Sequence, residues 1–415
     1  PPRSTQSRSS AASDVYKRQV QYHMVVPEST MSPYDNDTGL GGYTPFQSID
    51  FNLAVPGRKL LKNSLRIEGK IIATKSGAQV GNWQPANATA ATSSIHLTDN
   101  IKLDNVVGAH AFFDSWTCET QSKGIMEHLA NYPRYISQHG RATLGADDML
   151  SSKLVAECRG PYEINGNYVL QPVSDQAFVS LAAEQVDQRS APTFSIAPSI
   201  MWNRQAGGDY SFDRNGFIRV SCVLAANRHA LFGGVAGGDY VLDDIVCRFV
   251  SVPDDGTDEP MLMRSYVNVV SSLQSTATTI SARVPSQQVN SVSMSFINQG
   301  HMQSSEFCST ALENLPKWDS VEYLFANSMQ NYVTYRITDE DDALRRGLES
   351  MESAGHSQVS AKTLKANRGT LFGLDFSEYV DLSQQKFTIN LQIADASVAD
   401  DPFDVHLYFN SLLQM

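Results

Sequence analysis

Two stretches of the sequence resemble ion-binding or phosphate-binding loops, and each lacks a residue that such binding needs. Residues 35–39 (DNDTG) look like the start of an EF-hand calcium loop, but its twelfth position would be Phe46, where calcium requires a bidentate glutamate. Residues 232–238 (FGGVAGG) are rich in glycine, but neither a Lys-Ser or Lys-Thr pair nor a helical pattern follows them. We therefore predict turns at both places.

Residue types used in catalysis are present, but without the spacing that catalysis requires. The nine histidines include His110, His128, His139 and His301, and none belongs to an H-E-x-x-H motif or to a histidine pair at helical spacing. Glu127 lies beside His128, as carboxylates often do on a protein surface, and no G-x-S-x-G motif occurs. The sequence thus predicts no catalytic, cofactor-binding or metal-binding residue and no cofactor, and we expect no enzymatic activity.

The cysteines and the clustered aromatic residues are expected to be structural. The number of cysteines is odd and no two of them form a C-x-x-C pair, so buried thiols in a reducing compartment are the simplest interpretation. They are Cys118, Cys158, Cys222, Cys247 and Cys308. Phe112, Phe113 and Trp116 are expected to pack in the core. The sequons at Asn36 and Asn87 carry little weight because the sequence shows no secretory signal pattern.

Length and charge narrow the possible classes of protein. The 415 residues suffice for two or three domains, and charged residues make up only 18 %, which fits a surface largely covered by neighbours. The net charge is −12, from 32 basic and 44 acidic residues, whereas a protein wrapped around nucleic acid has a basic surface. No apolar run approaches the ~18 residues that span a bilayer. We expect synthesis in the cytosol and no direct, sequence-specific binding of nucleic acid.

Alternation of apolar and polar residues dominates the chain. Period-two alternation indicates strands with one buried and one wet face, as in antiparallel sandwiches, and it occurs at 49–55, 65–71, 218–224, 387–393 and 403–409. Helical patterns are few: one over 123–132 that ends before Pro133, one near 147–157, and one whose N-cap is Thr338 and whose first turn is acidic. We predict an all-β fold with short helical insertions.

The two halves of the chain share a pattern that indicates an internal duplication. FNLAVPGRKLLKNSLRIEGKI begins at Phe51 and ISARVPSQQVNSVSMSFI begins at Ile280. Each gives a strand that ends in Val-Pro, a polar turn and a second strand, and Pro56 matches Pro285 at an offset of 229.

A second matching unit and an acidic linker complete the predicted organisation. A strand–loop–strand–helix unit begins at Ile101 in the first half and at Val321 in the second, an offset of 220. The stretch PDDGTDEP from Pro253 combines two prolines, a glycine and four acids and is expected to be a solvated hinge. We predict a disordered or artefactual leader at 1–19, a first jelly roll at 20–252, an acidic Pro/Gly linker at 253–261 and a second jelly roll at 262–415.

With two tandem halves of this kind, the chain resembles the double jelly-roll major capsid proteins of tailless icosahedral DNA viruses, the lineage that includes adenovirus hexon. The resemblance runs from residue 43 to 415. It is carried best by YTPFQSIDFNLAVPGRKLLKNSLRIEGKI, from Tyr43, and by FGLDFSEYVDLSQQKFTINLQIADASVADDPFDVHLYFNSLLQM, which ends the chain. It implies two tandem jelly-roll β-sandwiches of eight strands each.

The resemblance also implies a function. The chain would be a structural major capsid protein of the virion, made in the cytoplasm or nucleus of a host cell and assembled as a homotrimer of pseudo-hexagonal outline. Its partners would be further copies of itself, in the trimer and in neighbouring capsomers, together with minor capsid or penton proteins. An internal membrane beneath the shell is neither implied nor excluded.

Three other functions stay open at this point. A penton or minor capsid protein usually has a single jelly roll. A two-domain β-sandwich binding protein would recognise a carbohydrate or a receptor through an exposed aromatic platform. A hydrolase on a β scaffold would need a convergent acid/base pair. The assembly state tests these alternatives. A stable trimer or hexagonal arrays would support the capsid function, and a monomer with affinity for glycans would contradict it.

Overall fold

The computed structural model describes two β-sandwiches and the segments that join them. The described residues are 20–29, 32–35, 40–75, 78–79, 103–104, 106–143, 156–159, 162–164, 167–169, 193–231, 239–257, 260–285, 288–303, 310, 317–326, 329, 332–355, 371–400 and 402–414. Among them, no helix has both the length and the apolar composition that a membrane crossing needs. The leader at 1–19 and nearly all of the helix predicted near 147–157 lie outside them.

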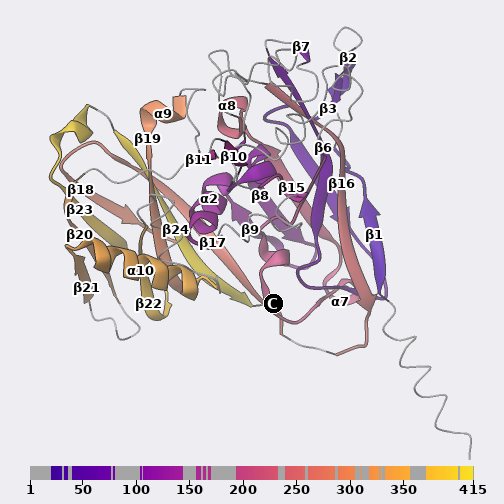
Figure 1. The fold of residues 1–415 in the computed structure, drawn as a ribbon. Helices are drawn as coiled ribbons and strands as arrows, with labels where there is room; N and C mark the ends of the chain where they lie inside the picture. Colours follow the sequence, from indigo (N-terminus) through magenta and orange to yellow (C-terminus); the bar gives the residue numbers. More distant parts are fainter. Residues whose placement is uncertain are drawn as a thin grey trace, which may run out of the picture.

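The first sandwich consists of two antiparallel sheets (Figure 1). The first wide sheet has the strand order β12 (Thr193–Ile196), β6 (Arg66–Lys75), β16 (Asp239–Pro253), β1 (Gln21–Val25). Short strands extend it: β5 (Arg58–Leu60), β7 (Ala78–Gln79) and β14 (Tyr210–Ser211). The first narrow sheet has the order β4 (Ser48–Leu53), β15 (Ile218–Leu224), β8 (Phe113–Thr120), β9 (Gly124–Leu129).

The second sandwich repeats this arrangement. The second wide sheet has the order β22 (Phe372–Val380), β19 (Val289–Asn298), β24 (Phe403–Gln414), β17 (Leu262–Leu273), and β13 (Gln205–Gly207) is added at its edge. The second narrow sheet has the order β18 (Ala277–Ala282), β23 (Phe387–Ile393), β20 (Trp318–Ala326), β21 (Tyr332–Ile337). Each sandwich therefore has eight main strands in two sheets of four with the same connectivity, which confirms the predicted pair of tandem jelly rolls.

Strand positions sharpen the predicted duplication. The starts of β4 and β18 differ by 229 residues (277 − 48), the offset predicted from the two Val-Pro pairs. The starts of β8 and β20 differ by 205 (318 − 113), and those of β9 and β21 by 208 (332 − 124), so the predicted offset of 220 is wrong. The reason is local: the described residues between 103 and 112 form turns and the 3-10 helix η2 (Gly108–Phe112), not the expected strand.

Among the described residues two helices are long, and both follow the second strand of a narrow-sheet hairpin. They are α2 (Tyr132–Thr143) and α10 (Glu340–Ser353). The helix predicted over 123–132 is wrong, because that stretch pairs with β8 as β9; Pro133 lies in the first turn of α2, where proline is tolerated. The N-cap of α10 is Asp339 and not Thr338, since the Asp339 carboxylate accepts hydrogen bonds from the backbone of Asp341 and Asp342.

The remaining described elements are short. They are β2 (Ser32–Asp35) with β3 (Leu40–Gly42), β10 (Tyr162–Ile164) with β11 (Asn167–Val169), η3 (Met201–Asn203), α7 (Phe212–Asn215), α8 (Asn227–Ala230), α9 (Gln299–Gln303) and η4 (Ala396–Ala399).

Each sandwich has its own apolar core. The predicted alternation is confirmed on β4, β15 and β23, where apolar side chains are buried and most of their polar neighbours are partly or fully exposed. On β24 the expectation of one wet face is wrong, because His406, Tyr408 and Asn410 are buried as deeply as the apolar residues between them. The polar face of β24 is covered by the first sandwich, and this contact is the most distinctive feature of the molecule.

Candidate functional site

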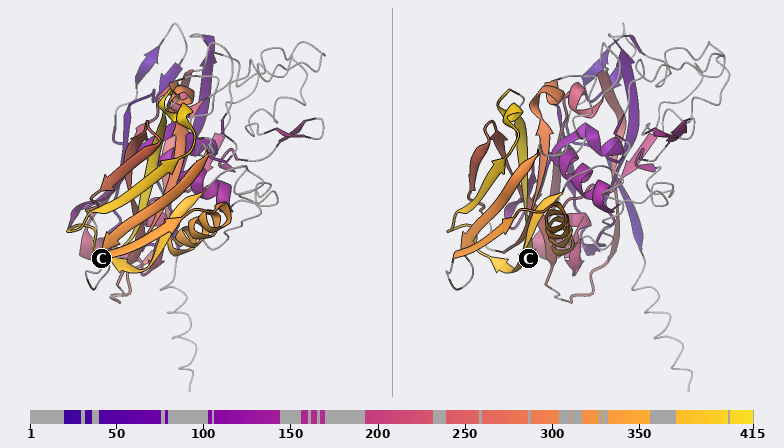
Figure 2. Two further views of the ribbon diagram at one scale, coloured as in Figure 1. Left: turned by 90° about the vertical axis from the view of Figure 1, so that its left-hand side faces the viewer. Right: turned by 60° about the vertical axis from the view of Figure 1, so that its left-hand side comes forward.

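The outer face of the second wide sheet is covered partly by α10, which packs on β22 and β19, and partly by elements of the first sandwich. The contact with the first sandwich is called the seam. Figure 2 shows α2 lying between the second sandwich and the strands of the first. The seam comprises α2, the edge strand β9 and the η3–β13 segment on one side, and β17, β24 and β19 on the other. Strand β13 even pairs with β17, so backbone of the first sandwich continues the second wide sheet.

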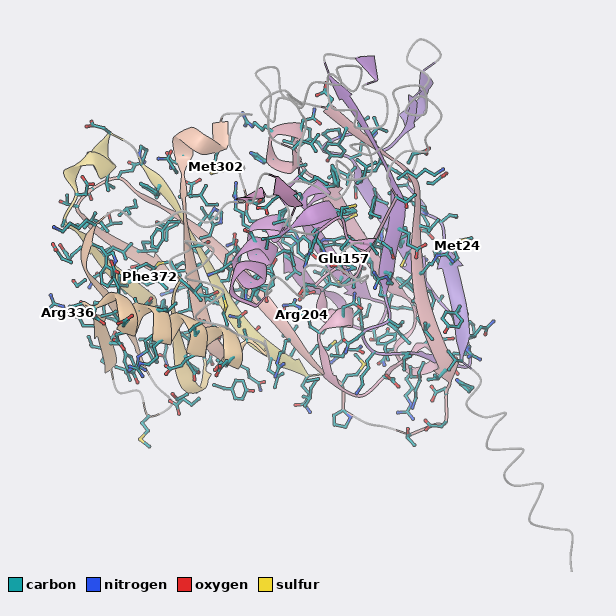
Figure 3. All side chains as sticks on the ribbon, in the orientation of Figure 1. Met24, Glu157, Arg204, Met302, Arg336 and Phe372 are labelled. Carbon is teal, nitrogen blue, oxygen red and sulfur yellow. The ribbon has the colours of Figure 1, made fainter. Side chains whose placement is uncertain are left out.

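A buried ion pair lies at the centre of the seam. Arg204 Nη2 donates to Glu127 Oε1 at 2.5 Å, and Figure 3 shows Arg204 between the two sandwiches. The same carboxylate accepts hydrogen bonds from Ser265 Oγ on β17 (2.6 Å) and from the backbone nitrogen of Met201 (2.7 Å). Burial raises the pKa of Glu127, while Arg204 and these donors favour its ionised form. Glu127 was expected at the surface beside His128; instead it ties the sandwiches together.

Aromatic rings surround this ion pair. The Tyr135 ring on α2 stacks on Tyr266 of β17, with centroids 3.8 Å apart, and meets Tyr408 of β24 edge-on at 5.4 Å. The Arg204 guanidinium lies over the Tyr135 and Tyr266 rings at 5.8 and 5.3 Å from their centroids. The Arg204 cation thus contacts two aromatic faces and the Glu127 carboxylate inside a buried contact. These interactions fix the first sandwich in position against the second wide sheet.

A second polar contact crosses the seam at the N-terminal end of α2. Arg134 Nη1 lies 3.2 Å from His406 Nε2 on β24, and Asn131 Nδ2 donates to Asn268 Oδ1 at 2.7 Å. Burial and the neighbouring Arg134 cation lower the pKa of His406 well below its usual value. His406 is therefore neutral near pH 7, and its Nε2 accepts a hydrogen bond from Arg134 Nη1.

The cluster that most resembles a catalytic site is sealed inside the first sandwich. His110 lies 2.7 Å from the Tyr132 hydroxyl through Nδ1 and 3.4 Å from Glu157 Oε2 through Nε2. The Tyr132 hydroxyl accepts from the backbone of Ser199 and so donates to His110, which places the His110 proton on Nε2. Burial lowers the pKa of His110 to about 4, and the bond from His110 and the Arg159 cation hold that of Glu157 at about 2. All these side chains are buried, so no substrate reaches them in this conformation.

The acidic linker is less solvated than predicted. Lys59 Nζ donates to Asp255 Oδ1 at 2.6 Å and lies 3.5 Å from Asp254 Oδ1, whose side chain is only 9 % exposed and also accepts from Ser211. The bond from Lys59 lowers the pKa of Asp255. The linker is thus fastened to β5 and β14 of the first sandwich, so the prediction of a solvated hinge is wrong for Asp254.

Some of the other sequence predictions are confirmed, and others concern residues outside the described ranges. Four cysteines are free and buried as expected: Cys118, Cys158, Cys222 and Cys247. The predicted aromatic cluster of Phe112, Phe113 and Trp116 lies in the core, with no exposed side-chain surface. Residues 36–39 and 232–238 and Cys308 lie outside the described residues. Among the described residues, no group of three or more His, Cys, Asp and Glu side chains could hold a metal ion.

The outer face of the first wide sheet is exposed around β1, unlike the outer face of the second wide sheet. Tyr22, Met24 and Val26 point away from the core on and just after β1, and they are 81, 58 and 65 % exposed. Beside them lies a groove of about 770 Å³ over β6, β12 and β16. Four of the charged side chains around it form two pairs, Lys70 with Asp244 and Arg248 with Glu68.

Comparison with known proteins identifies the architecture. No protein-family model matches the sequence, and no curated protein matches it significantly. The crystal structure of PBCV-1 VP54, fitted into a cryo-EM reconstruction of the virophage Sputnik, is 10 % identical with a TM-score of 0.55 and covers 96 % of this chain and 95 % of that chain. The Faustovirus major capsid protein is 10 % identical with a TM-score of 0.58 over 96 % of this chain and 90 % of that chain. The chain has the double jelly-roll fold.

Within the double jelly roll, sequence reasoning missed the residues that join the sandwiches. Glu127, Arg204 and Ser265 come from three separate segments, and none belongs to a motif. One signal was available: His406, Tyr408 and Asn410 alternate with apolar residues near the carboxyl end, and tyrosine and histidine are common on covered polar faces.

Proposed function

We propose that the chain is a structural major capsid protein that assembles with copies of itself into the shell of an icosahedral virion. The observation that carries this proposal is the double jelly roll itself, which aligns over 96 % of the chain with the Faustovirus major capsid protein. The proposal includes the absence of enzymatic activity, since the cluster most like a catalytic site is buried and internally satisfied.

The composition supports a shell role. The net charge of −12 disfavours direct wrapping of nucleic acid, so the chain would enclose a genome without binding it specifically. A low charged fraction suits a protein whose surface is covered by neighbours in the assembled particle. We place the protein in the virion after synthesis in the cytoplasm or nucleus of the host cell.

The capsomer in this proposal is a homotrimer. Three chains contribute six jelly rolls and give a pseudo-hexagonal outline, and neighbouring trimers tile the facets of the shell. Minor capsid or penton proteins would fill positions that this chain does not occupy. The division into a first jelly roll at 20–252, a linker at 253–261 and a second jelly roll at 262–415 belongs to the same proposal.

Assembly of the purified chain tests the proposal. Mass photometry and negative-stain microscopy of the full chain are expected to show trimers and, at high concentration, hexagonal arrays. A protein that stays monomeric at all concentrations and binds immobilised glycans would contradict the proposal and favour a carbohydrate-binding function.

A further inference from the structure

The end of the seam where α2 begins is held by an arginine and a histidine. Arg134 Nη1 on α2 lies 3.2 Å from His406 Nε2 on β24. The same guanidinium donates to Asn131 Oδ1 at 3.1 Å and lies 3.6 Å from Met302 Sδ on α9, the short helix that follows β19. Arg134 thus spans the seam, and its partner on β24 is a side chain that can itself become a cation.

The described surroundings of His406 are uncharged except for Arg134. His406 is 1 % exposed, and its Nδ1 has no hydrogen-bond partner among the described residues. Its neighbours in the sheet are Val270 on β17 and Ser295 on β19. The ring of Tyr408 on the same strand lies nearly parallel to it, with 6.3 Å between the centroids. A proton on His406 would therefore have a cation as its nearest charged neighbour and no counterion among these contacts.

Other titratable groups act on the Arg134 cation. The carboxylates of Asp114 on β8 and Asp404 on β24 attract it. Burial raises the pKa of Asp114, so acid neutralises this carboxylate at a higher pH than it would an exposed aspartate. Burial lowers the pKa of His229 on α8 to about 4, and the cations of Arg134 and Arg228 add to this effect. Acid therefore removes negative charge near Arg134 and adds positive charge there.

Protonation of His406 reverses the character of its contact with Arg134. The neutral ring accepts a hydrogen bond through Nε2, whereas the protonated ring is a donor at both nitrogens and faces a second cation. Like charges at this distance repel strongly where water is excluded. In an open seam the ring is solvated and its pKa is about 6.5. The closed seam is therefore fully favoured above that pH and loses stability as the pH falls below it.

The centre of the seam titrates in the opposite sense. Burial raises the pKa of Glu127, so a proton on its carboxyl group favours the closed seam. This shift is smaller than the lowering of the pKa of His406, which burial and Arg134 cause together. The balance in acid is therefore set by His406.

We propose that the seam opens in mildly acidic solution, because a proton on His406 replaces its hydrogen bond from Arg134 by repulsion between two cations, and the two sandwiches then separate as folded units. Most of the apolar core of each sandwich lies within that sandwich, so opening does not require either to unfold. In a shell subunit, such opening makes the particle sensitive to acid, a property beyond the structural role proposed above.

One backbone hydrogen bond reports whether the seam is closed. The Arg264 amide on β17 donates to the carbonyl oxygen of Arg204 across the seam at 3.1 Å. Opening breaks this bond and exposes the amide to hydrogen exchange. Amides in β23, which pairs with a strand on each side within the second narrow sheet, keep their bonds when the seam opens.

Hydrogen exchange of the full chain at single-residue resolution, corrected for the intrinsic effect of pH, tests the proposal at pH 7.5 and 5.0. Mass photometry is used to choose a concentration that gives the same assembly state at both values. We expect the protection of the Arg264 amide to fall at least tenfold, because uptake of one proton shifts the opening equilibrium by up to about tenfold per pH unit below about 6.5. Amides in β23 are expected to stay better protected than Arg264 at pH 5.0.

Three variants assign the effect to His406. His406→Gln keeps an acceptor for Arg134 but cannot take up a proton, so the protection of Arg264 is expected to change by less than about threefold. Arg134→Gln keeps a donor but removes the cation, and a smaller fall than in the unaltered chain is expected. His110→Gln is the matched control, since it removes the other buried histidine outside the seam and is expected to keep the full fall.

Two results would overturn the proposal. An equal fall of Arg264 protection in His406→Gln and in the unaltered chain would show that this histidine does not open the seam. Equal protection of Arg264 and the β23 amides at pH 5.0 in the unaltered chain would show that acid unfolds the sandwiches and does not separate them. The second result requires no variant, so the proposal stays testable even if a substitution prevents folding.

Discussion

The two wide sheets have the same strand order and opposite outer surfaces. The second wide sheet presents serine, histidine and tyrosine, and these are buried in the seam; the first presents tyrosine, methionine and valine, and these are exposed. On the covered face, Ser293 and His406 are hydrogen-bonded to residues of α2. The exposed face carries apolar side chains on β1 beside the charged pairs of β6 and β16. The contact within the chain thus combines directed polar bonds with stacked aromatic rings, while the apolar side chains of β1 stay in solvent.

The largest expected loss in the free energy of unfolding comes from removing one partner of the buried ion pair in the seam. Arg204→Met leaves the Glu127 carboxylate buried without its cation, and removing one partner of a buried pair costs about 3–5 kcal/mol. We expect urea denaturation to show this loss in the free energy of unfolding. Arg345→Met is the control, because Arg345 on α10 pairs with Asp342 and Glu349 in solvent, where such pairs contribute little. Equal losses in the two variants would show that the ion pair does not hold the seam.

Acid is expected to destabilise the first sandwich through its buried histidine, His110. The pKa of His110 is about 4 in the folded chain and about 6.5 when unfolded, so between these values the unfolded state binds more protons. Stability is therefore full above about pH 6.5 and falls as the pH is lowered toward 4, by about 3 kcal/mol from His110 alone.

Denaturation midpoints at pH 7.5 and 4.5 check this direction. His110→Gln removes the titrating group, so its loss over this range is expected to be smaller than that of the unaltered chain. His128→Gln, at an exposed histidine, is the control and is expected to keep the full loss. An identical acid loss in all three chains would show that His110 does not titrate in this range.

A smaller effect compares two buried tyrosine hydroxyls. The Tyr132 hydroxyl bonds to His110 and Ser199 in the first sandwich, whereas the Tyr408 hydroxyl in the seam has no hydrogen-bond partner among the described residues. Tyr132→Phe leaves polar partners unsatisfied and is expected to cost about 1–3 kcal/mol, while Tyr408→Phe is expected to be neutral or stabilising. Thermal unfolding of both variants measures the difference. A large loss for Tyr408→Phe would indicate an ordered water at that hydroxyl.

Local pattern predicted the strands and the duplication, because each strand shows its own period of two and each Val-Pro pair ends a strand in its own half. It failed where tertiary contact overrides local preference. Residues 124–129 have apolar spacing compatible with a helix, yet pairing with β8 makes them β9. The seam could not be predicted, since Glu127, Arg204 and Ser265 are far apart in sequence and only the packing of the two sandwiches brings them together.

The smallest expected effect concerns the exposed face itself. Met24 is 58 % exposed on β1, so Met24→Ser is expected to change the free energy of unfolding by less than about 0.5 kcal/mol. Its counterpart test on the covered sheet is Ser295→Met, which forces a larger side chain beneath α2 and is expected to cost about 1–3 kcal/mol. Both values come from urea denaturation at a concentration low enough to keep the chain monomeric. If Met24→Ser destabilised the monomer as much as Ser295→Met does, Met24 would be part of a contact within the chain.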